Sequence, residues 1–196
     1  MQEFIKQIRS ELRESANVKQ NFSEELLGRI ARFADTGAAA LKKGHKIIFF
    51  GNGGSAADAQ HLAAELVVRL QRSRAGLAAI SLTTNASVLT AAGNDFGFEN
   101  IFARQIESLA SAGDILVALS TSGKSANVLR GADAGHAKHA FVAGMTGETG
   151  GELAGKVDLL INVPSRNAQR IQEAHITIGH IVCGLIEQIC CGETSA

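Results

Sequence analysis

Five short apolar runs, each bounded by turn residues, constrain most strongly what this chain of 196 residues can fold into. Each run is five to eight residues long and apolar on both faces, as expected of buried parallel strands. The runs are KIIFF (46 to 50), LAAISL (77 to 82), DILVALS (114 to 120), HAFVAGMT (139 to 146) and LLINVP (159 to 164). Helix-like stretches at 55 to 70, 98 to 111 and 125 to 137 alternate with them, and a last helix is expected from about Asn167 to Cys190. The alternation predicts an α/β fold with a five-stranded parallel sheet and helices on both sides.

The N-terminal segment has a different pattern. Residues 2 to 43 carry apolar side chains at helical intervals and predict two helices ahead of the sheet. The chain is long enough for one full core and short for two. We therefore expect a single domain over residues 1–196, a three-layer sandwich with an N-terminal helical segment (1–45) and an α/β core (46–196). In such sheets ligands bind outside the carboxyl ends of the strands, so the chemistry is expected in the loops that follow them.

Charge and composition exclude several classes of function. Nineteen Lys and Arg balance nineteen Asp and Glu, so no net field favours nucleic acid or an anionic membrane surface. No apolar run approaches the roughly 20 residues of a membrane span, and the start MQEFIKQIRSELRE lacks an apolar signal core. We expect a cytoplasmic protein that binds neither nucleic acid nor membrane, and whose three cysteines are reduced structural residues.

A glycine-rich loop, GNGGS (51 to 55), follows the first predicted strand. Ser55 and Asp58 have the Ser-x-x-acid form of a helix N-cap. Glycines let the chain approach a ligand closely and first-turn amides favour anions, so the loop indicates an anion site, or else a plain tight turn. The segment also fits the G-x-G-x-x-A dinucleotide fingerprint, but the second strand leads into TTN (83 to 85) without the acidic residue that a ribose needs. A nicotinamide or flavin enzyme is therefore disfavoured.

A serine-rich loop, STSGKSAN (120 to 127), follows the third predicted strand. Its four hydroxyls fall within six residues at the start of another helix, and hydroxyls with helix-start amides can surround a phosphate. The end of the loop fits a P-loop, but the required first glycine is Ala118, which makes nucleotide hydrolysis improbable. A serine-rich turn with alternative caps would look similar. Two such loops at neighbouring strand ends favour a phosphate monoester site.

Titratable residues lie on the helix that follows the glycine-rich loop. His61 and Glu65 are four residues apart and share one helix face, with Asp58 and Arg69 near the same line. Such a pair can share a metal ion or a proton-transfer task, although many pairs of this spacing are only surface contacts. Their position two to three turns beyond the proposed phosphate loop favours a functional role.

The last predicted helix carries a second set of polar residues among apolar neighbours. Gln172 and Glu173 lie two turns before His180 and project to roughly the same side, whereas His175 points elsewhere. Spacing alone does not choose between Gln172 and Glu173. It also leaves open whether His180 is a ligand or a satisfied core histidine.

Four motifs in order give the chain a resemblance that extends over nearly its whole length. They are GNGGSAADAQHLAAE (51 to 65), AAGNDFGFENIFARQ (91 to 105), LSTSGKSANVL (119 to 129) and RIQEAHITIGHIVCGLIE (170 to 187). With these motifs the chain resembles the phosphoheptose isomerases, members of the sugar isomerase (SIS) domain family. The resemblance implies one flavodoxin-like SIS domain and a homotetramer with active sites shared between subunits. It also implies conversion of D-sedoheptulose 7-phosphate to D-glycero-D-manno-heptose 7-phosphate, a step toward the heptose of lipopolysaccharide.

The resemblance further implies roles for individual residues. Those implied for the phosphate are Ser55, Ser120, Thr121, Ser122 and Ser125. Those implied for the sugar are Asn52, Gly53, Gly54, Glu65, Asn94, Asp95 and Gln172. One zinc ion per subunit would be held by His61, Glu65, Gln172 and His180. Some relatives have an acidic residue three positions before Gln172, where this chain has Gln169.

The implied reaction suits these residues. Aldose-ketose isomerisation moves a proton between C1 and C2 through an enediol, which needs a base and a group that stabilises the developing oxyanion. We expect Glu65 to be the base and His180 its acid-base partner. The alternative is a non-catalytic relative that uses the same fold to bind a replication initiator or another protein. Such relatives lose the metal and acid-base residues, whereas this chain keeps His61, Glu65 and His180.

Overall fold

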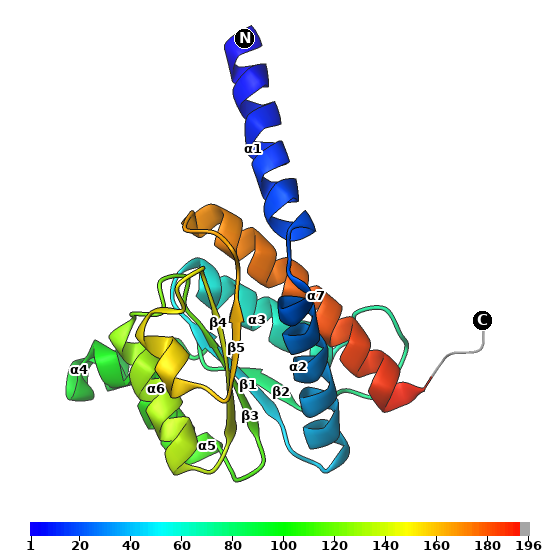
Figure 1. Ribbon diagram of the computed structural model, residues 1–196. Helices are drawn as coiled ribbons and strands as arrows, with labels where there is room; N and C mark the ends of the chain where they lie inside the picture. Colours follow the sequence, from blue (N-terminus) through cyan, green and yellow to red (C-terminus); the bar gives the residue numbers. More distant parts are fainter. Residues whose placement is uncertain (193–196) are drawn as a thin grey trace.

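The computed structural model describes residues 1–192 as a parallel sheet covered by helices, with one helix projecting from the body (Figure 1). The strands are β1 (Ile47–Gly51), β2 (Ala79–Ser81), β3 (Ile115–Leu119), β4 (Phe141–Thr146) and β5 (Leu159–Asn162). The α-helices are α1 (Gln2–Gln20), α2 (Glu24–Lys42), α3 (Gly54–Val67), α4 (Ala86–Phe96), α5 (Ile101–Leu109), α6 (Ala126–Ala137) and α7 (Ala168–Cys191). Two short 3-10 helices are η1 (Phe98–Asn100) and η2 (Gly151–Lys156). The single-domain prediction also spans residues 193–196, which lie outside the described residues.

The sheet has the strand order β2-β1-β3-β4-β5, and every neighbouring pair is parallel. The chain runs from β1 to the edge strand β2 and then crosses back to β3, so the order reverses between β1 and β3. Gly51 at the end of β1 pairs with Leu119 at the end of β3. The glycine-rich and serine-rich loops therefore begin side by side, at the switch point where sheets of this kind bind ligands.

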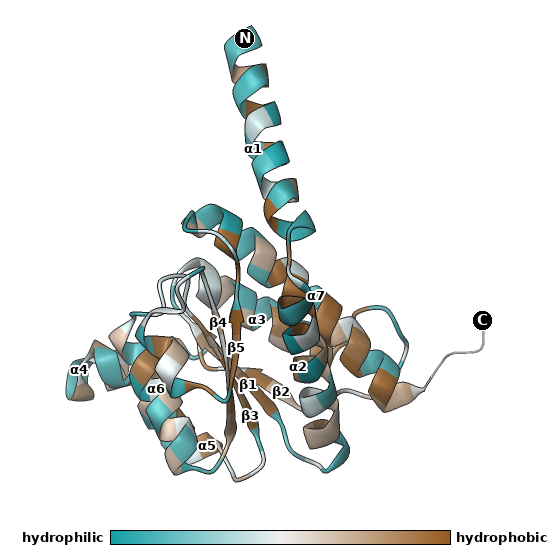
Figure 2. Ribbon diagram, viewed as in Figure 1, coloured by the Kyte–Doolittle hydropathy of each residue, from teal (hydrophilic) through white to brown (hydrophobic). Residues whose placement is uncertain are grey.

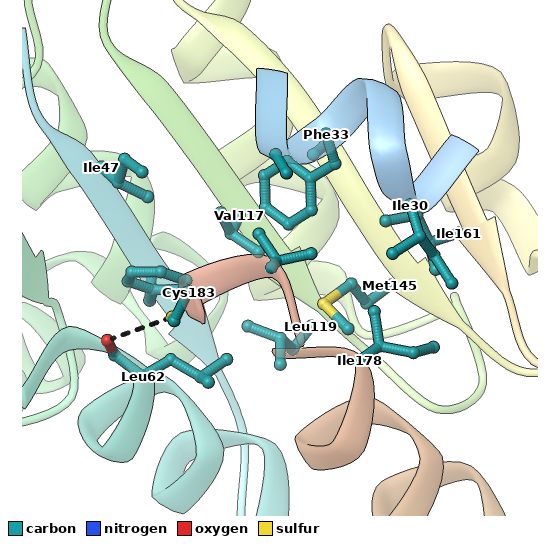
Figure 3. Close-up of a cluster of buried hydrophobic side chains, with 14 of the residues drawn as sticks. Ile30, Phe33, Ile47, Leu62, Val117, Leu119, Met145, Ile161, Ile178 and Cys183 are labelled. Carbon is teal, nitrogen blue, oxygen red and sulfur yellow. Dashed lines mark hydrogen bonds between the residues drawn. The ribbon is translucent and has the colours of Figure 1, made fainter. Parts of the chain in front are cut away.

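Successive residues of the central strands fill two cores on opposite faces of the sheet. Ile47 and Phe49 point into one core with α2, α3 and α7, part of which is drawn in Figure 3. Ile48 and Phe50 point into the other with α5 and α6. Burial of one such side chain contributes roughly 1.5–3 kcal/mol to the stability of the fold. Figure 2 shows the strands as an apolar layer between the helices. The predicted three-layer α/β sandwich with five parallel strands is confirmed.

The two N-terminal helices are also confirmed, but they differ in what they cover. α2 packs on the sheet with Leu26, Ile30 and Phe33 buried. α1 projects away from the body, and all its residues are at least partly exposed, with Phe4 and Leu12 each 66% exposed (Figure 1). A single copy of the chain therefore leaves the apolar side of α1 uncovered.

Two elements differ from the sequence prediction. α4 was not expected, because Ala92 is its one buried residue and the apolar periodicity is correspondingly weak. Its start is nevertheless marked by Asn85, whose side chain accepts a hydrogen bond from the backbone N–H of Val88 at 3.1 Å. β2 is only three residues long, and Ile80 is partly exposed because β2 is an edge strand. The prediction of burial on both faces is wrong for this strand.

α7 also differs from the expectation that nothing approaches a membrane span. By length and composition alone this helix is apolar enough to cross a membrane. The prediction considered uninterrupted apolar runs, whereas α7 keeps a high mean hydropathy although polar residues interrupt it. Its buried residues pack in the core beneath α2 and α3, as in the core helix of a water-soluble fold.

Candidate active site

The glycine-rich loop leads into α3 one residue earlier than the sequence suggested. Gly53, with a φ of 55°, is the N-cap, and its carbonyl accepts hydrogen bonds from the N–H groups of Ala56 and Ala57. The prediction of Ser55 as N-cap is therefore wrong, because glycine adopts this left-handed conformation without strain and begins the helix before the serine. Ser55 lies in the first turn and is buried at 3% exposure.

Two glycines permit close approaches around this turn. A Cβ on Gly51 would lie 2.7 Å from the Leu119 carbonyl oxygen, so β1 and β3 could not end as closely together with a larger residue. A Cβ on Gly54 would lie 2.6 Å from the side-chain nitrogen of Gln172. Gln172 of α7 therefore lies directly against the start of α3.

The serine-rich loop is held by hydrogen bonds within itself. The Ser120 hydroxyl accepts from the N–H of Gly123 at 3.1 Å and lies 3.2 Å from the hydroxyl of Ser125, which precedes α6. The Ser122 hydroxyl accepts from the N–H of Lys124 at 3.2 Å. These contacts gather the hydroxyls of Ser120, Ser122 and Ser125 just before the first turn of α6, and hydroxyls beside a helix N-terminus are groups that bind anions.

A cleft of about 390 Å³ opens beside this loop. Thr121, Ser122 and Lys124 of the loop line it together with Arg166 and Ile171. Sequence reasoning did not select Arg166, which pairs with Glu148 in the loop after β4. The cleft thus combines hydroxyls with cationic groups at the carboxyl edge of the sheet.

Asn52 joins the two loops. Its side-chain amide donates to Asn127 at 2.8 Å and accepts from the Asn127 amide at 2.9 Å. Asn127 lies in the first turn of α6 and is almost fully buried. Sequence reasoning placed Asn52 at the sugar and missed Asn127. The position of Asn127 at the end of the serine-rich motif was the one sequence feature that could have indicated it.

Three potential metal ligands meet between α3 and α7. His61 Nε2 lies 3.1 Å from a Glu65 oxygen and 2.8 Å from Nε2 of His180, although His61 and His180 are 119 positions apart. One ligand atom from each residue lies within 4.8 Å of the others. Glu65 is mostly buried, and the His61 side chain is half exposed. The His61–Glu65 pair therefore belongs to a cluster built from two helices.

The donor set fits a metal ion. Imidazole nitrogens and carboxylate oxygens are ligands that zinc takes, and at bond lengths of about 2.0–2.1 Å tetrahedral neighbours lie about 3.4 Å apart. The observed separations of 2.8 and 3.1 Å need only small side-chain shifts to reach this value. The cluster can thus hold a metal ion.

A partly buried carboxylate supports this fit. Burial raises the pKa of Asp58 to about 6, an effect that the neighbouring His61 opposes. One oxygen of Asp58 is buried and has no hydrogen-bond partner among residues 1–192. An unpartnered carboxylate oxygen near His61 is the kind of group that a bound cation or ligand satisfies. Sequence reasoning treated Asp58 mainly as a helix-capping residue.

Gln172 and Glu173, between which spacing did not choose, have different neighbours in the structure. Gln172 contacts Gly54 at the site, whereas Glu173 lies 3.4 Å from Arg170, which binds Glu11 of α1. His175 points away from the cluster, as expected, and its Nε2 bonds to a backbone carbonyl at the end of β4. Gln172 is therefore the one of the two that lies against the glycine-rich loop.

Two of the predicted sugar contacts lie elsewhere within the chain. Asn94 and Asp95 are exposed on α4 and bond to each other at 2.7 Å. α4 lies at the left edge of the view in Figure 1, next to α5 and apart from α3. A single copy of the chain does not bring these two residues to the metal-ligand cluster.

Comparison with known proteins shows the family to which the chain belongs. The sequence model of the SIS domain matches residues 12–147. The chain is 49% identical over 187 residues to a phosphoheptose isomerase of Aquifex aeolicus (strain VF5), a match that covers 95% of this chain and 98% of the relative. It is 50% identical over 182 residues to one of Geobacter metallireducens, covering 93% and 96%.

Two solved structures that superpose on this chain are also phosphoheptose isomerases. Phosphoheptose isomerase GmhA from Neisseria gonorrhoeae superposes with a TM-score of 0.89 at 40% identity, over 94% of this chain and 99% of that one. A phosphoheptose isomerase from Francisella tularensis superposes with a TM-score of 0.90 at 35% identity, over 94% and 98%. The chain belongs to the SIS domain family. Within that family it is a member of the phosphoheptose isomerases, and its fold and enzyme class are those of its relatives.

Proposed function

We propose that this chain interconverts D-sedoheptulose 7-phosphate and D-glycero-D-manno-heptose 7-phosphate in the cytoplasm, on the route to lipopolysaccharide heptose. The observation that carries the proposal is the meeting of His61, Glu65 and His180 beside the two phosphate-type loops. The chain from 1 to 196 then acts as one SIS domain.

The substrate's phosphate is held at the carboxyl edge of the sheet in this proposal. Hydroxyls and helix-start amides from both loops surround it, through Ser55, Ser120, Thr121, Ser122 and Ser125. The close contacts among Ser120, Gly123 and Ser125 support this role, because they fix the loop in one conformation before a substrate binds. The sugar then extends toward α3 and α7, past Asn52, Gly53, Gly54 and Gln172.

Glu65 and His180 move protons in the proposed mechanism. Glu65 takes a proton from C1 of the ketose and delivers it to C2. His180, the acid-base partner, gives a proton to O2 and takes one from O1. A zinc ion, one per subunit, held by His61, Glu65, Gln172 and His180, supplies polarisation of the carbonyl when it is bound. Gln169 is exposed in the first turn of α7, and the proposal assigns it no step.

The protein acts as a homotetramer with shared active sites in this proposal. The uncovered apolar side of α1 supports self-association, because exposed apolar patches of this kind mark interfaces. The exposed position of Asn94 and Asp95 supports sharing, since α4 of one copy can reach the site of another only in an assembly.

The non-catalytic alternative is not favoured. A protein-binding relative needs no base and no metal ligands, yet this chain brings both together from two helices. The relatives that it matches at about half identity are named isomerases.

Turnover of sedoheptulose 7-phosphate by Glu65→Gln and His180→Gln variants tests the proposal. Each substitution should lower kcat by about 10²- to 10⁴-fold, and the double variant should be scarcely worse, because residues that act as a unit are not additive. Zinc must be measured in every variant, since metal loss imitates loss of the base. Glu107→Gln, an exposed glutamate paired with Arg104 on α5, is the control and should keep normal turnover. Near-normal turnover by a zinc-loaded Glu65→Gln enzyme would refute the catalytic assignment.

A further inference from the structure

The helices α3 and α7 pack closely beside the two histidines of the site. Gly179 immediately precedes His180, and Leu62 immediately follows His61. A Cβ at position 179 would lie 2.6 Å from Cδ1 and 3.1 Å from Cγ of Leu62, closer than ordinary carbon contacts of about 3.5–4.0 Å. Leu62 cannot move away freely, because it is buried in the core together with Cys183 of α7 (Figure 3). A larger residue at 179 would therefore force the helices apart next to the ligand atoms.

A second contact joins the two helices further along. Glu187, two turns beyond His180, is fully buried, and its carboxylate accepts hydrogen bonds from the segment that follows α3. The donors are the backbone N–H groups of Leu70, Gln71 and Arg72 at 2.9, 3.0 and 3.3 Å, and the Arg74 guanidinium at 2.9 Å. The end of α7 is thereby fixed to the chain that leaves α3.

The Arg74 guanidinium also reaches back to α3. It donates to the carbonyl of Glu65 at 2.9 Å and to that of Leu66 at 2.8 Å. Carbonyls in the last turn of a helix have no hydrogen-bond donors within the helix, and here the guanidinium supplies those donors. One of these carbonyls belongs to a metal-ligand residue. The backbone position of Glu65 is thus tied through Arg74 to Glu187 on the other ligand-bearing helix.

We infer that Gly179 and the Arg74–Glu187 ion pair are positioning residues that set the separation of α3 and α7 and so hold His61, Glu65 and His180 at metal-binding distance. This inference rests on the proposed metal role of the cluster. A planar, forked guanidinium can bind a carboxylate and two carbonyls together, whereas an ammonium presents a single charged point. If the ion pair only stabilised the fold, its loss would lower the melting temperature and leave the metal affinity of the folded protein unchanged.

Titration of the metal-free, full-length protein with Co²⁺ separates these roles, since the visible absorption of Co²⁺ reports its ligands as well as its affinity. Arg74→Lys, Glu187→Gln and Gly179→Ala should each weaken binding about 10- to 100-fold, as loss of supporting contacts around a metal site does. Addition of Leu62→Ala to Gly179→Ala should restore much of the affinity by removing the clash. All titrations are made well below each variant's melting temperature, with folding checked by circular dichroism.

Asp114→Asn is the matched control. Asp114 is equally buried and accepts hydrogen bonds from Ser111 N–H and from Lys46, but it lies at the amino end of β3, away from the site. It should lower the melting temperature without changing Co²⁺ affinity. Because Arg74→Lys and Gly179→Ala change different contacts, the test survives if Glu187→Gln fails to fold.

The possible outcomes are distinguishable. Unchanged Co²⁺ affinity in folded Arg74→Lys and Gly179→Ala proteins would overturn the positioning role and leave the metal site standing. An equal loss of affinity in Asp114→Asn would overturn it too, since destabilisation alone would then be the cause. A wild-type chain that binds neither Co²⁺ nor Zn²⁺ would refute the metal role and, with it, this inference.

Discussion

A buried histidine should make the stability of this protein depend on pH below neutrality. His175 of α7 is fully buried, and its Nε2 lies 3.1 Å from the carbonyl oxygen of Thr146. A carbonyl only accepts, so Nε2 carries the proton and Nδ1 is bare. Nδ1 is buried without a hydrogen-bond partner among residues 1–192. Protonation of Nδ1 would therefore bury a positive charge whose N–H has no hydrogen-bond acceptor. For this reason burial lowers the pKa of His175 from 6.5 to about 4.

The sign and size of the effect follow from linkage. The unfolded chain binds a proton more readily than the folded one, so stability is fully present above pH 6.5 and is lost as the pH falls toward 4. A difference of about 2.5 pKa units corresponds to roughly 3 kcal/mol in total, at about 1.4 kcal/mol for each unit. Between pH 7.5 and pH 5.5 the expected loss is about 1 kcal/mol.

Denaturant unfolding of wild type and His175→Gln at one chain concentration measures this loss. The glutamine amide can still donate to the Thr146 carbonyl but does not titrate in this range. Wild type should lose about 1 kcal/mol more than the variant between the two pH values. Equal pH dependence in the two proteins would refute the reasoning, whatever the absolute stability of the variant.

Two further predictions concern the phosphate and the assembly. Replacement of Ser120 and Ser122 together by alanine should raise KM strongly, because the phosphate helps to position the reacting carbons; steady-state kinetics with an unchanged KM would place the phosphate elsewhere. Replacement of Phe4 and Leu12 on α1 by serine should dissociate the proposed tetramer, because both side chains are exposed in the single chain. Light scattering checks this at micromolar concentration, and a tetramer that survives both substitutions would place the interface elsewhere.

The sheet could be predicted from sequence because its signal is local. A parallel strand covered on both sides is a continuous apolar run, as β1 and β3 are, and the pattern is visible without knowledge of the neighbours. α4 gives no such signal, since it buries only Ala92. The start of α3 was predicted at the wrong residue because Ser55 resembles an N-cap in sequence. The positive φ of Gly53 is visible only in the structure.

The site was less accessible to sequence reasoning because its contacts join distant segments. Asn52 and Asn127 are 75 positions apart, and neither motif alone indicates that their amides pair. His61 and His180 could be assigned to one site only through the family resemblance. The structure adds a physical reason for choosing Gln172 over Glu173, since only Gln172 contacts the start of α3.

The spacing of Ser55 and His61 along α3 sets a minimum length for a substrate whose phosphate is held at Ser55. Ser55 and His61 are six residues apart, which is about 9 Å along a helix at about 1.5 Å per residue. A heptose chain has six carbon-carbon bonds of about 1.5 Å, which span about 7.5 Å when extended. Because side chains six residues apart also point to different sides of a helix, about 9 Å is the least distance that a substrate with its phosphate at Ser55 must span to reach His61, where Glu65 and His180 also lie. A phosphotriose held by the same loops would end well short of the cluster, so the helical spacing itself favours a long-chain sugar phosphate.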